Sequence, residues 1–155
     1  MKVYFASDHA GYELKNRLFD FVQNTLSYEC YDCGAMTLDP GDDYPAIIAG
    51  AARALAEDVV HGIESRAIVL GGSGTGEAII ANRFRGVRAA VYYGGNDAIV
   101  RLSREHNDAN VLSLGARFIS HDDAKSAVRL WLSTPFSNDE RHLRRIAEIE
   151  SVIQQ

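Results

Sequence analysis

The chain alternates short apolar runs with longer segments in which apolar residues recur every three or four positions. Short apolar runs that end in glycine or polar residues predict buried β-strands, whereas the wider spacing predicts helices with one apolar face. The strands are expected at 2–6, 27–32, 67–70, 87–93 and 110–114. The helices are expected at 11–23, 44–58, 77–84, 96–105, 122–132 and 139–153.

Strands separated by helices imply right-handed crossovers and a parallel sheet with helices on both faces. The pattern therefore predicts an α/β fold: a doubly wound α/β/α sandwich with a five-stranded parallel sheet and a charged C-terminal helix. A length of 155 residues fits a single domain, 1–155. Because ligands bind outside the carboxyl ends of the strands in such folds, the polar residues at strand ends are the candidates for chemistry.

The third predicted strand ends in the glycine-rich turn Gly71–Gly76, which leads into a helix at Glu77. A phosphate-binding P-loop would require lysine at 77, and the dinucleotide pattern G-x-G-x-x-G would require glycine there. A nucleophile elbow around Ser73 would require glycine in place of Thr75. The turn favours an anion, but Glu77 would repel a nucleotide phosphate. Glu77 fits a base beside an anionic intermediate, or simply an acidic residue that stabilises the helix N-terminus.

Other polar residues flank the predicted strands. Asp8 and His9 follow the first strand, where Asp8 could act in chemistry or serve only as a helix cap. His106 and Asn107 precede the fifth strand, as functional groups or as part of an ordinary turn. Arg117 follows that strand and places a cation near the same sheet.

The C-terminal helix carries a basic cluster. Arg141 and Arg145 are four residues apart and therefore share one helical face. Two guanidinium groups on one face can hold a phosphate, although a solvated face neutralised by Glu140 and Glu148 would have the same pattern. On an acidic protein, such a cluster favours a small anionic ligand.

Composition narrows the classes of function. The chain is 46% hydrophobic and 24% charged with a net charge of -5, which is typical of a soluble globular protein and argues against nucleic-acid binding. No apolar stretch approaches the roughly 20 residues that span a bilayer, and the N-terminus lacks the pattern of a signal peptide. A cytoplasmic location is expected. Cys30 and Cys33 lie on or beside a strand and point to opposite faces, so we expect neither a redox nor a metal site there.

Four motifs occur in the order Ser7–Gly11, Gly72–Glu77, His106–Leu112 and Arg141–Arg145. With these motifs the chain closely resembles the RpiB/LacAB sugar-phosphate isomerase family, which includes type B ribose-5-phosphate isomerases, and the resemblance covers nearly the whole chain. The resemblance implies a Rossmann-like α/β/α fold. It also implies interconversion of aldose and ketose phosphates, ribose 5-phosphate and ribulose 5-phosphate above all, without metal or cofactor. Members work as homodimers or dimers of dimers whose active sites are shared between subunits.

The resemblance also implies roles for individual residues. His106 assists opening of the furanose ring, and Asn107 binds sugar hydroxyls. Ser73 and the glycine turn (Gly72, Gly74 and Gly76) stabilise the enediolate. Asp8 and Tyr44 contact the sugar. The phosphate is held by His9, Arg117, Arg141 and Arg145, some of which reach across the dimer interface.

One position departs from the common family pattern. Many members carry a cysteine base directly after the third strand, where this chain has Gly71. A subgroup uses a glutamate in the glycine turn instead, and Glu77 matches it. Alternatives remain open: the same chemistry on erythrose 4-phosphate, allose 6-phosphate or galactose 6-phosphate, or a non-catalytic phosphosugar-binding module. A flavodoxin-like nucleotide or flavin binder is disfavoured because the dinucleotide fingerprint is missing.

Overall fold

The computed structural model describes residues 1–152 of the 155-residue chain. The strands are β1 (Lys2–Ser7), β2 (Glu29–Asp32), β3 (Ser65–Gly71), β4 (Ala89–Tyr92) and β5 (Val111–Gly115). The helices are α1 (Tyr12–Asp20), the π-helical turn η1 (Phe21–Thr25), α2 (Tyr44–Val60), α3 (Thr75–Ala81), α4 (Ala98–Asn107), α5 (His121–Ser133) and α6 (Glu140–Val152).

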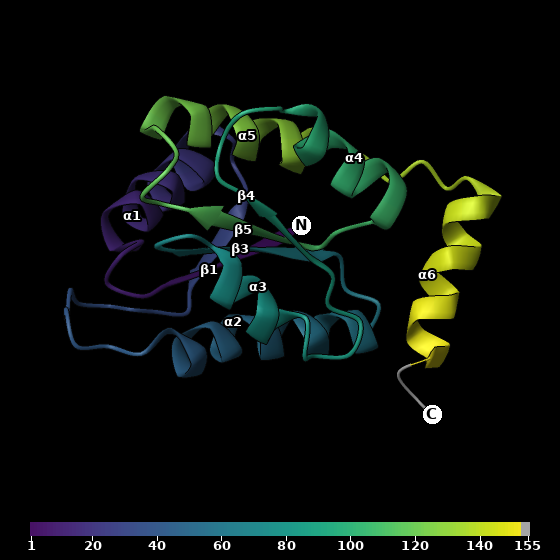
Figure 1. Cartoon of the computed structure of the whole chain (residues 1–155), viewed down its shortest axis with the longest axis horizontal. Coiled ribbons are helices and arrows are strands. Elements are labelled where there is room, and N and C mark those ends of the chain that lie inside the picture. Colours follow the sequence, from purple (N-terminus) through teal and green to yellow (C-terminus); the bar gives the residue numbers. More distant parts are fainter. Residues whose placement is uncertain (153–155) are drawn as a thin grey trace.

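The strands form one five-stranded sheet in the order β2-β1-β3-β5-β4, and every neighbouring pair is parallel. The chain first steps from β1 out to β2, then returns past β1 to β3 through α2. This reversal of winding puts helices on both faces, with α1, α4 and α5 on one and α2 and α3 on the other (Figure 1). The predicted doubly wound α/β fold is confirmed.

Alternating side chains of β1 supply the cores on both faces of the sheet. Val3 and Phe5 pack beneath α1 and α5, while Tyr4 and Ala6 pack against α2. Burial of a side chain such as Phe5 stabilises the fold by about 1.5–3 kcal/mol. Because both faces are covered, the central strands are apolar almost throughout, as expected of buried parallel strands.

Three element boundaries differ from the sequence prediction in ways that matter for the site. The α3 helix begins at Thr75 because Gly74 takes a left-handed conformation with φ of 76°. The α4 helix runs to Asn107, so His106 and Asn107 form its last turn instead of a loop. The β4 strand is restricted to Ala89–Tyr92. The predicted last residue of the final helix, Ile153, lies outside the described residues.

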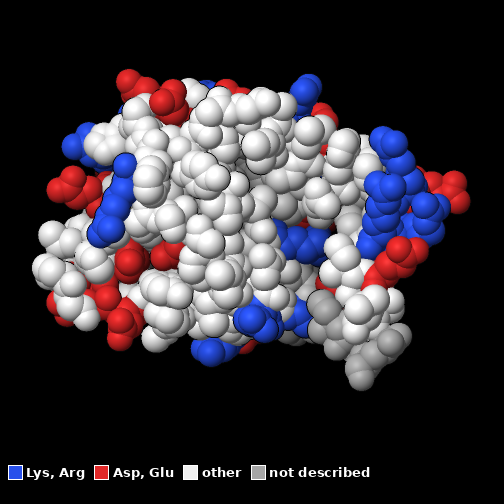
Figure 2. Space-filling view, in the orientation of Figure 1, with Lys and Arg blue, Asp and Glu red and all other residues white. Residues whose placement is uncertain are grey.

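The charged C-terminal helix is confirmed as α6, which stands apart from the sheet beside the end of α4 (Figure 1). The basic side chains Arg141, Arg144 and Arg145 are exposed on it, and Figure 2 shows basic groups gathered over this helix at the right of the molecule. Within residues 1–152, every helix is too short or too polar to cross a membrane.

Candidate active site

The loops after β1, β3 and β5 meet at the carboxyl edge of the sheet. The loop after β5 is hydrogen-bonded to the glycine turn, since the N–H groups of Ala116 and Arg117 donate to the carbonyls of Gly71 and Gly72 at 2.8 and 3.1 Å. The Ser113 hydroxyl donates to the carbonyl of Gly74 at 2.5 Å. The turn is therefore held from β5 as well as from its own strand.

Two glycines of the turn are required by close contacts. A Cβ on Gly74 would lie 2.9 Å from the main-chain carbon of Leu114, and its positive φ disfavours any other residue. A Cβ on Gly76 would lie 2.7 Å from the ring of Tyr44. Tyr44, at the start of α2, thus lies directly over the turn.

Glu77 is in the first turn of α3 and only 4% of its surface is exposed. Its carboxylate lies beside Gly71, so close that a Cβ on residue 71 would overlap its Oε1 and Cδ atoms. Burial raises the pKa of Glu77, and the nearby charge of Asp8 raises it further. A buried carboxylate at this edge with a raised pKa is suited to taking up a proton.

Asp8 and His9 follow β1 at the same edge. The Asp8 carboxylate is buried and accepts hydrogen bonds from the N–H groups of Ala10 and Gly11 at 3.0 and 3.3 Å, as a helix cap would. Asp8 caps the helix and also lies near Glu77, so a role as a helix cap and a role in chemistry do not exclude each other.

Asp42 is a partner of His9 that the sequence analysis missed. Its Oδ1 lies 2.7 Å from Nδ1 of His9 and accepts from the His9 N–H at 3.0 Å. This hydrogen bond is the main reason that the pKa of His9 is raised, with the charges of Asp8 and Asp42 contributing. Because Nδ1 is engaged, Nε2 is the nitrogen left for a ligand. The sequence carried no signal of this pair, because the two residues are 33 positions apart.

Asp8, His9 and Asp42 also bring ligand-type atoms within 4.8 Å of one another. The remaining predicted residues at this edge are Ser73 and Arg117, both exposed. Ser73 Oγ accepts from the N–H of Thr75 at 3.3 Å, and the Arg117 guanidinium lies against Gly72, 3.4 Å from where a Cβ would be. The carboxyl edge therefore gathers Asp8, His9, Tyr44, Gly72, Ser73, Gly74, Gly76, Glu77 and Arg117.

The other predicted residues form a second group, at the end of α4 and on α6. The rings of His106 and His142 stack with centroids 4.3 Å apart and planes 15° from parallel. His142 is buried, and its Nε2 accepts from Nε of Arg141 at 3.2 Å. Burial lowers the pKa of His142, as do the charges of His106 and Arg141. A neutral His142 thus fixes both neighbours.

The two groups lie at opposite ends of the sheet. His106 and Asn107 precede the start of β5, whereas Gly115 at its end pairs with Gly71 beside Glu77. A five-residue strand spans about 15 Å. In Figure 1 the β5 arrow points away from α6. Within one chain, Arg141, Arg145, His106 and Asn107 therefore do not join the carboxyl-edge residues.

Comparison with known proteins identifies the chain. A family model described as Ribose/Galactose Isomerase matches residues 3–149. The chain belongs to this family. Among relatives in the Ribose/Galactose Isomerase family, the ribose-5-phosphate isomerase B of Mycobacterium tuberculosis is 44% identical over 147 residues, covering 94% of this chain and 86% of that protein.

Solved structures of the Ribose/Galactose Isomerase family agree with the fold. Ribose-5-phosphate isomerase B of Mycoplasma genitalium, solved with bound ribulose 5-phosphate, superposes with a TM-score of 0.91 at 29% identity, covering 99% of this chain and 97% of that chain. The Clostridium thermocellum enzyme gives a TM-score of 0.86 at 39% identity, covering 99% and 98%. These matches extend over both groups of residues.

Proposed function

We propose that this chain is a ribose-5-phosphate isomerase that interconverts ribose 5-phosphate and ribulose 5-phosphate through an enediolate, with Glu77 as the base and without metal or cofactor. The observation that carries the proposal is the buried Glu77 carboxylate at the glycine turn, beside Asp8 and Tyr44. The names of the relatives and the ketose phosphate bound to one of them supply the substrate.

Glu77 takes the place of the cysteine base that the family resemblance implies for many members. That cysteine would stand at position 71, and the volume that its side chain would need is filled here by the Glu77 carboxylate. A side chain at position 71 and the side chain of Glu77 would thus occupy the same point in the structure. This geometry supports the assignment of the chain to the subgroup with a glutamate base.

The chemistry moves one proton between neighbouring carbons. In the open-chain aldose, Glu77 takes the proton from C2 and the C1 carbonyl oxygen becomes an enediolate oxygen. The proton then returns to C1, while the O2 hydroxyl proton passes to O1 and O2 becomes the carbonyl. Main-chain N–H groups of the turn and the Ser73 hydroxyl stabilise the developing oxyanion. The raised pKa of Glu77 suits both halves of this transfer, because a shuttle must release the proton as readily as it takes it.

Ring opening and much of the phosphate binding come from the second half-site. The carbon chain of a pentose has four C–C bonds of about 1.5 Å, at most about 6 Å in all, and cannot bridge the length of β5. A two-fold dimer solves this, because it sets the carboxyl edge of one chain against α4 and α6 of its partner and builds the site twice. His106, Asn107, Arg141 and Arg145 then act on the partner's substrate.

The surface around α6 supports a homodimer. Leu143, Ile149 and Val152 of α6 are about half exposed or more, at 49%, 47% and 67%. Beside the helix lies a mainly apolar hollow of about 500 Å³, whose walls include Phe84, Asn107 and Ile149. A second copy seated here buries apolar surface and places Asn107 at the interface.

His9 and Arg117 hold the phosphate from the carboxyl edge, which makes the binding depend on pH through Asp42. The pKa of His9 is raised, so the imidazolium persists at pH values above the ordinary histidine pKa of about 6.5. We expect KM of the wild type to rise only when the pH exceeds that ordinary pKa. In Asp42→Asn the rise should begin at lower pH, and KM near pH 7.5 should be about five- to tenfold higher with kcat unchanged, because a charge-assisted hydrogen bond is about 1 kcal/mol stronger than a neutral one.

The measurement for Asp42 is KM and kcat from pH 5.5 to 8.5. Asp39→Asn is the matched control, since Asp39 belongs to the same loop and its carboxylate accepts a hydrogen bond from the local N–H of Gly41 at 2.9 Å, not from His9. Identical pH profiles for Asp42→Asn and the wild type would remove His9 from the phosphate site.

The proposed function is tested by turnover of the purified, EDTA-treated protein on ribose 5-phosphate, beside erythrose 4-phosphate, allose 6-phosphate and galactose 6-phosphate. Fast conversion of ribose 5-phosphate is expected. Preference for another sugar would keep the mechanism and change the substrate. Activity lost with EDTA and restored by a divalent ion would assign Asp8, His9 and Asp42 to a metal. Phosphosugar binding without turnover would make the chain a binding module.

A further inference from the structure

The turn that ends α4 is held in an unusual way. His106 and Asn107 form the last turn of the helix, and the chain then passes through Asp108 in a left-handed conformation, with φ and ψ both 44°. Glycine commonly occupies such a position, and the last carbonyls of a helix lack partners within the helix. Here a residue with a side chain takes the strained conformation, so neighbouring groups must hold it.

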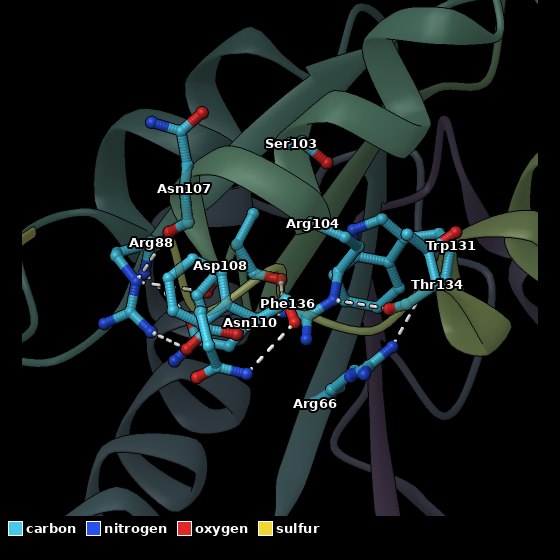
Figure 3. Close-up of polar contacts among 12 residues, drawn as sticks. Arg66, Arg88, Ser103, Arg104, Asn107, Asp108, Asn110, Trp131, Thr134 and Phe136 are labelled. Carbon is cyan, nitrogen blue, oxygen red and sulfur yellow. Dashed lines mark hydrogen bonds and ion pairs between the residues drawn. The ribbon is translucent and has the colours of Figure 1, made fainter. Parts of the chain in front are cut away.

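Arg88, next to the start of β4, supplies those contacts. Its Nε donates to the carbonyls of Asn107 and Asp108, both at 3.0 Å, and its Nη2 lies 2.8 Å from Oδ2 of Asp108 (Figure 3). The hydrogen bonds of Arg88 therefore bind the main chain at the helix end. In Figure 3 the Asn107 amide points away from Arg88, which leaves it available to a ligand.

A second arginine holds Asp108 from the interior. Nη1 of Arg104 lies 2.8 Å from Oδ1 of Asp108 and donates to the carbonyl of Ala109 at 2.6 Å. Arg104 is buried against Trp131, with its guanidinium 5.9 Å from the ring centroid. The Asp108 carboxylate is thus shared between two guanidinium groups, one fixed in the core, so the turn has little freedom to shift.

We propose that Arg88 is a positioning residue, which with Asp108 fixes the last turn of α4 and so sets the placement of His106 and Asn107 toward the sugar. The inference rests on the proposed function, because it assigns Arg88 to a reaction in which His106 takes part. Arg88 itself touches main-chain carbonyls and Asp108, and it acts on the substrate only through the turn.

Two measurements that differ in their need for ring opening separate this role from a general structural one. Ribose 5-phosphate is a closed furanose, and opening it breaks the C1–O4 bond, while O4 gains a proton and O1 loses one. Ribulose 5-phosphate has its O5 blocked by phosphate and is an open chain, so exchange of its C1 hydrogen with solvent through the enediolate needs no ring opening. A misplaced His106 therefore slows turnover of ribose 5-phosphate more than this exchange, whereas loss of folded protein lowers both equally.

The experiment measures kcat/KM for ribose 5-phosphate, the rate of C1 hydrogen exchange of ribulose 5-phosphate in deuterated solvent, and the melting temperature, for Arg88→Ala and Arg88→Lys. We expect Arg88→Ala to lower turnover of ribose 5-phosphate at least about tenfold and the exchange no more than about threefold, as a displaced catalytic group would. Lysine should not restore the ratio of turnover to exchange, because one ammonium cannot bridge two carbonyls and a carboxylate in the way the planar guanidinium does.

Arg66→Met is the matched control. Arg66 also donates to main-chain carbonyls, those of Trp131 and Leu132 at 2.8 and 3.0 Å, but does not touch the turn. It should lower the melting temperature and leave the ratio of turnover to exchange unchanged. If Arg88→Ala does not fold, Asp108→Asn takes its place, since asparagine tolerates the left-handed conformation and breaks the ion pairs.

The outcomes are distinguishable. A wild type active in turnover and in exchange, with an unchanged ratio of the two in Arg88→Ala, would overturn the positioning role and leave the proposed function standing. An equal change of ratio in Arg66→Met would also overturn it. A wild type that converts neither sugar would overturn the proposed function, and this inference with it.

Discussion

Glu77→Gln is expected to lower kcat about 10²- to 10⁴-fold, the contribution of a positioned general base. Glutamine is nearly isosteric with glutamate and fits the same buried space beside Gly71, but it cannot accept the proton from C2. KM should change little, because Arg117 and the phosphate site are untouched. Steady-state turnover of ribose 5-phosphate measures the effect.

The same substitution should not cost stability. The pKa of Glu77 is raised in the folded protein, so the folded state loses stability as the pH rises from the ordinary glutamate pKa through the raised pKa and the carboxyl group ionises. Glutamine does not ionise and avoids this loss of stability. The variant should therefore melt at the wild-type temperature or above at pH 8. Glu57→Gln, an exposed change on α2, is the control. A fall in kcat of less than about tenfold, or about 1.4 kcal/mol, would show that Glu77 is not the base.

Mixing two defective variants should restore activity. Arg141→Ala is expected to raise KM strongly, because it removes a phosphate contact from the second half-site. In a mixed dimer of Glu77→Gln and Arg141→Ala, one site carries both defects. The other combines the intact Glu77 of one chain with the intact Arg141 of its partner.

Random exchange of subunits makes half of the dimers mixed, so about a quarter of all sites should be intact at two-fold symmetry. The measurement is kcat/KM of the two variants after joint unfolding and refolding, compared with the two refolded separately. Glu77→Gln mixed with Glu57→Gln is the control, because there both substitutions leave the second half-site intact. Activity of the first mixture no greater than the sum of its parts would place each whole site within one chain.

The sheet could be predicted because its strands carry their own signal. Apolar runs such as 67–70 end in a glycine turn, and the alternation with helices leaves few arrangements for a parallel sheet. The end of α4 could not be predicted, because it is held by the contact between Arg88 and Asp108, which are 20 positions apart in the sequence. The link between His9 and Asp42 was hidden for the same reason.

The site itself was predicted as a set of residues and not as a geometry. The order of motifs predicted Glu77, His106 and Arg141 as members of one site, whereas the structure places Glu77 and His106 at opposite ends of β5. That separation follows from α4 running in the reverse direction to the strand that follows it. It becomes visible only once the sheet order places β5 beside β3.

The overlap between position 71 and the Glu77 carboxylate has a consequence for how such proteins diverge. A cysteine introduced at 71 alone would expel the Glu77 carboxylate from its place, and loss of Glu77 alone would leave that place empty. On the proposed mechanism, each single change leaves a protein with a displaced or missing base. We therefore expect an exchange of a glutamate base for a cysteine base to succeed only when residues 71 and 77 change together.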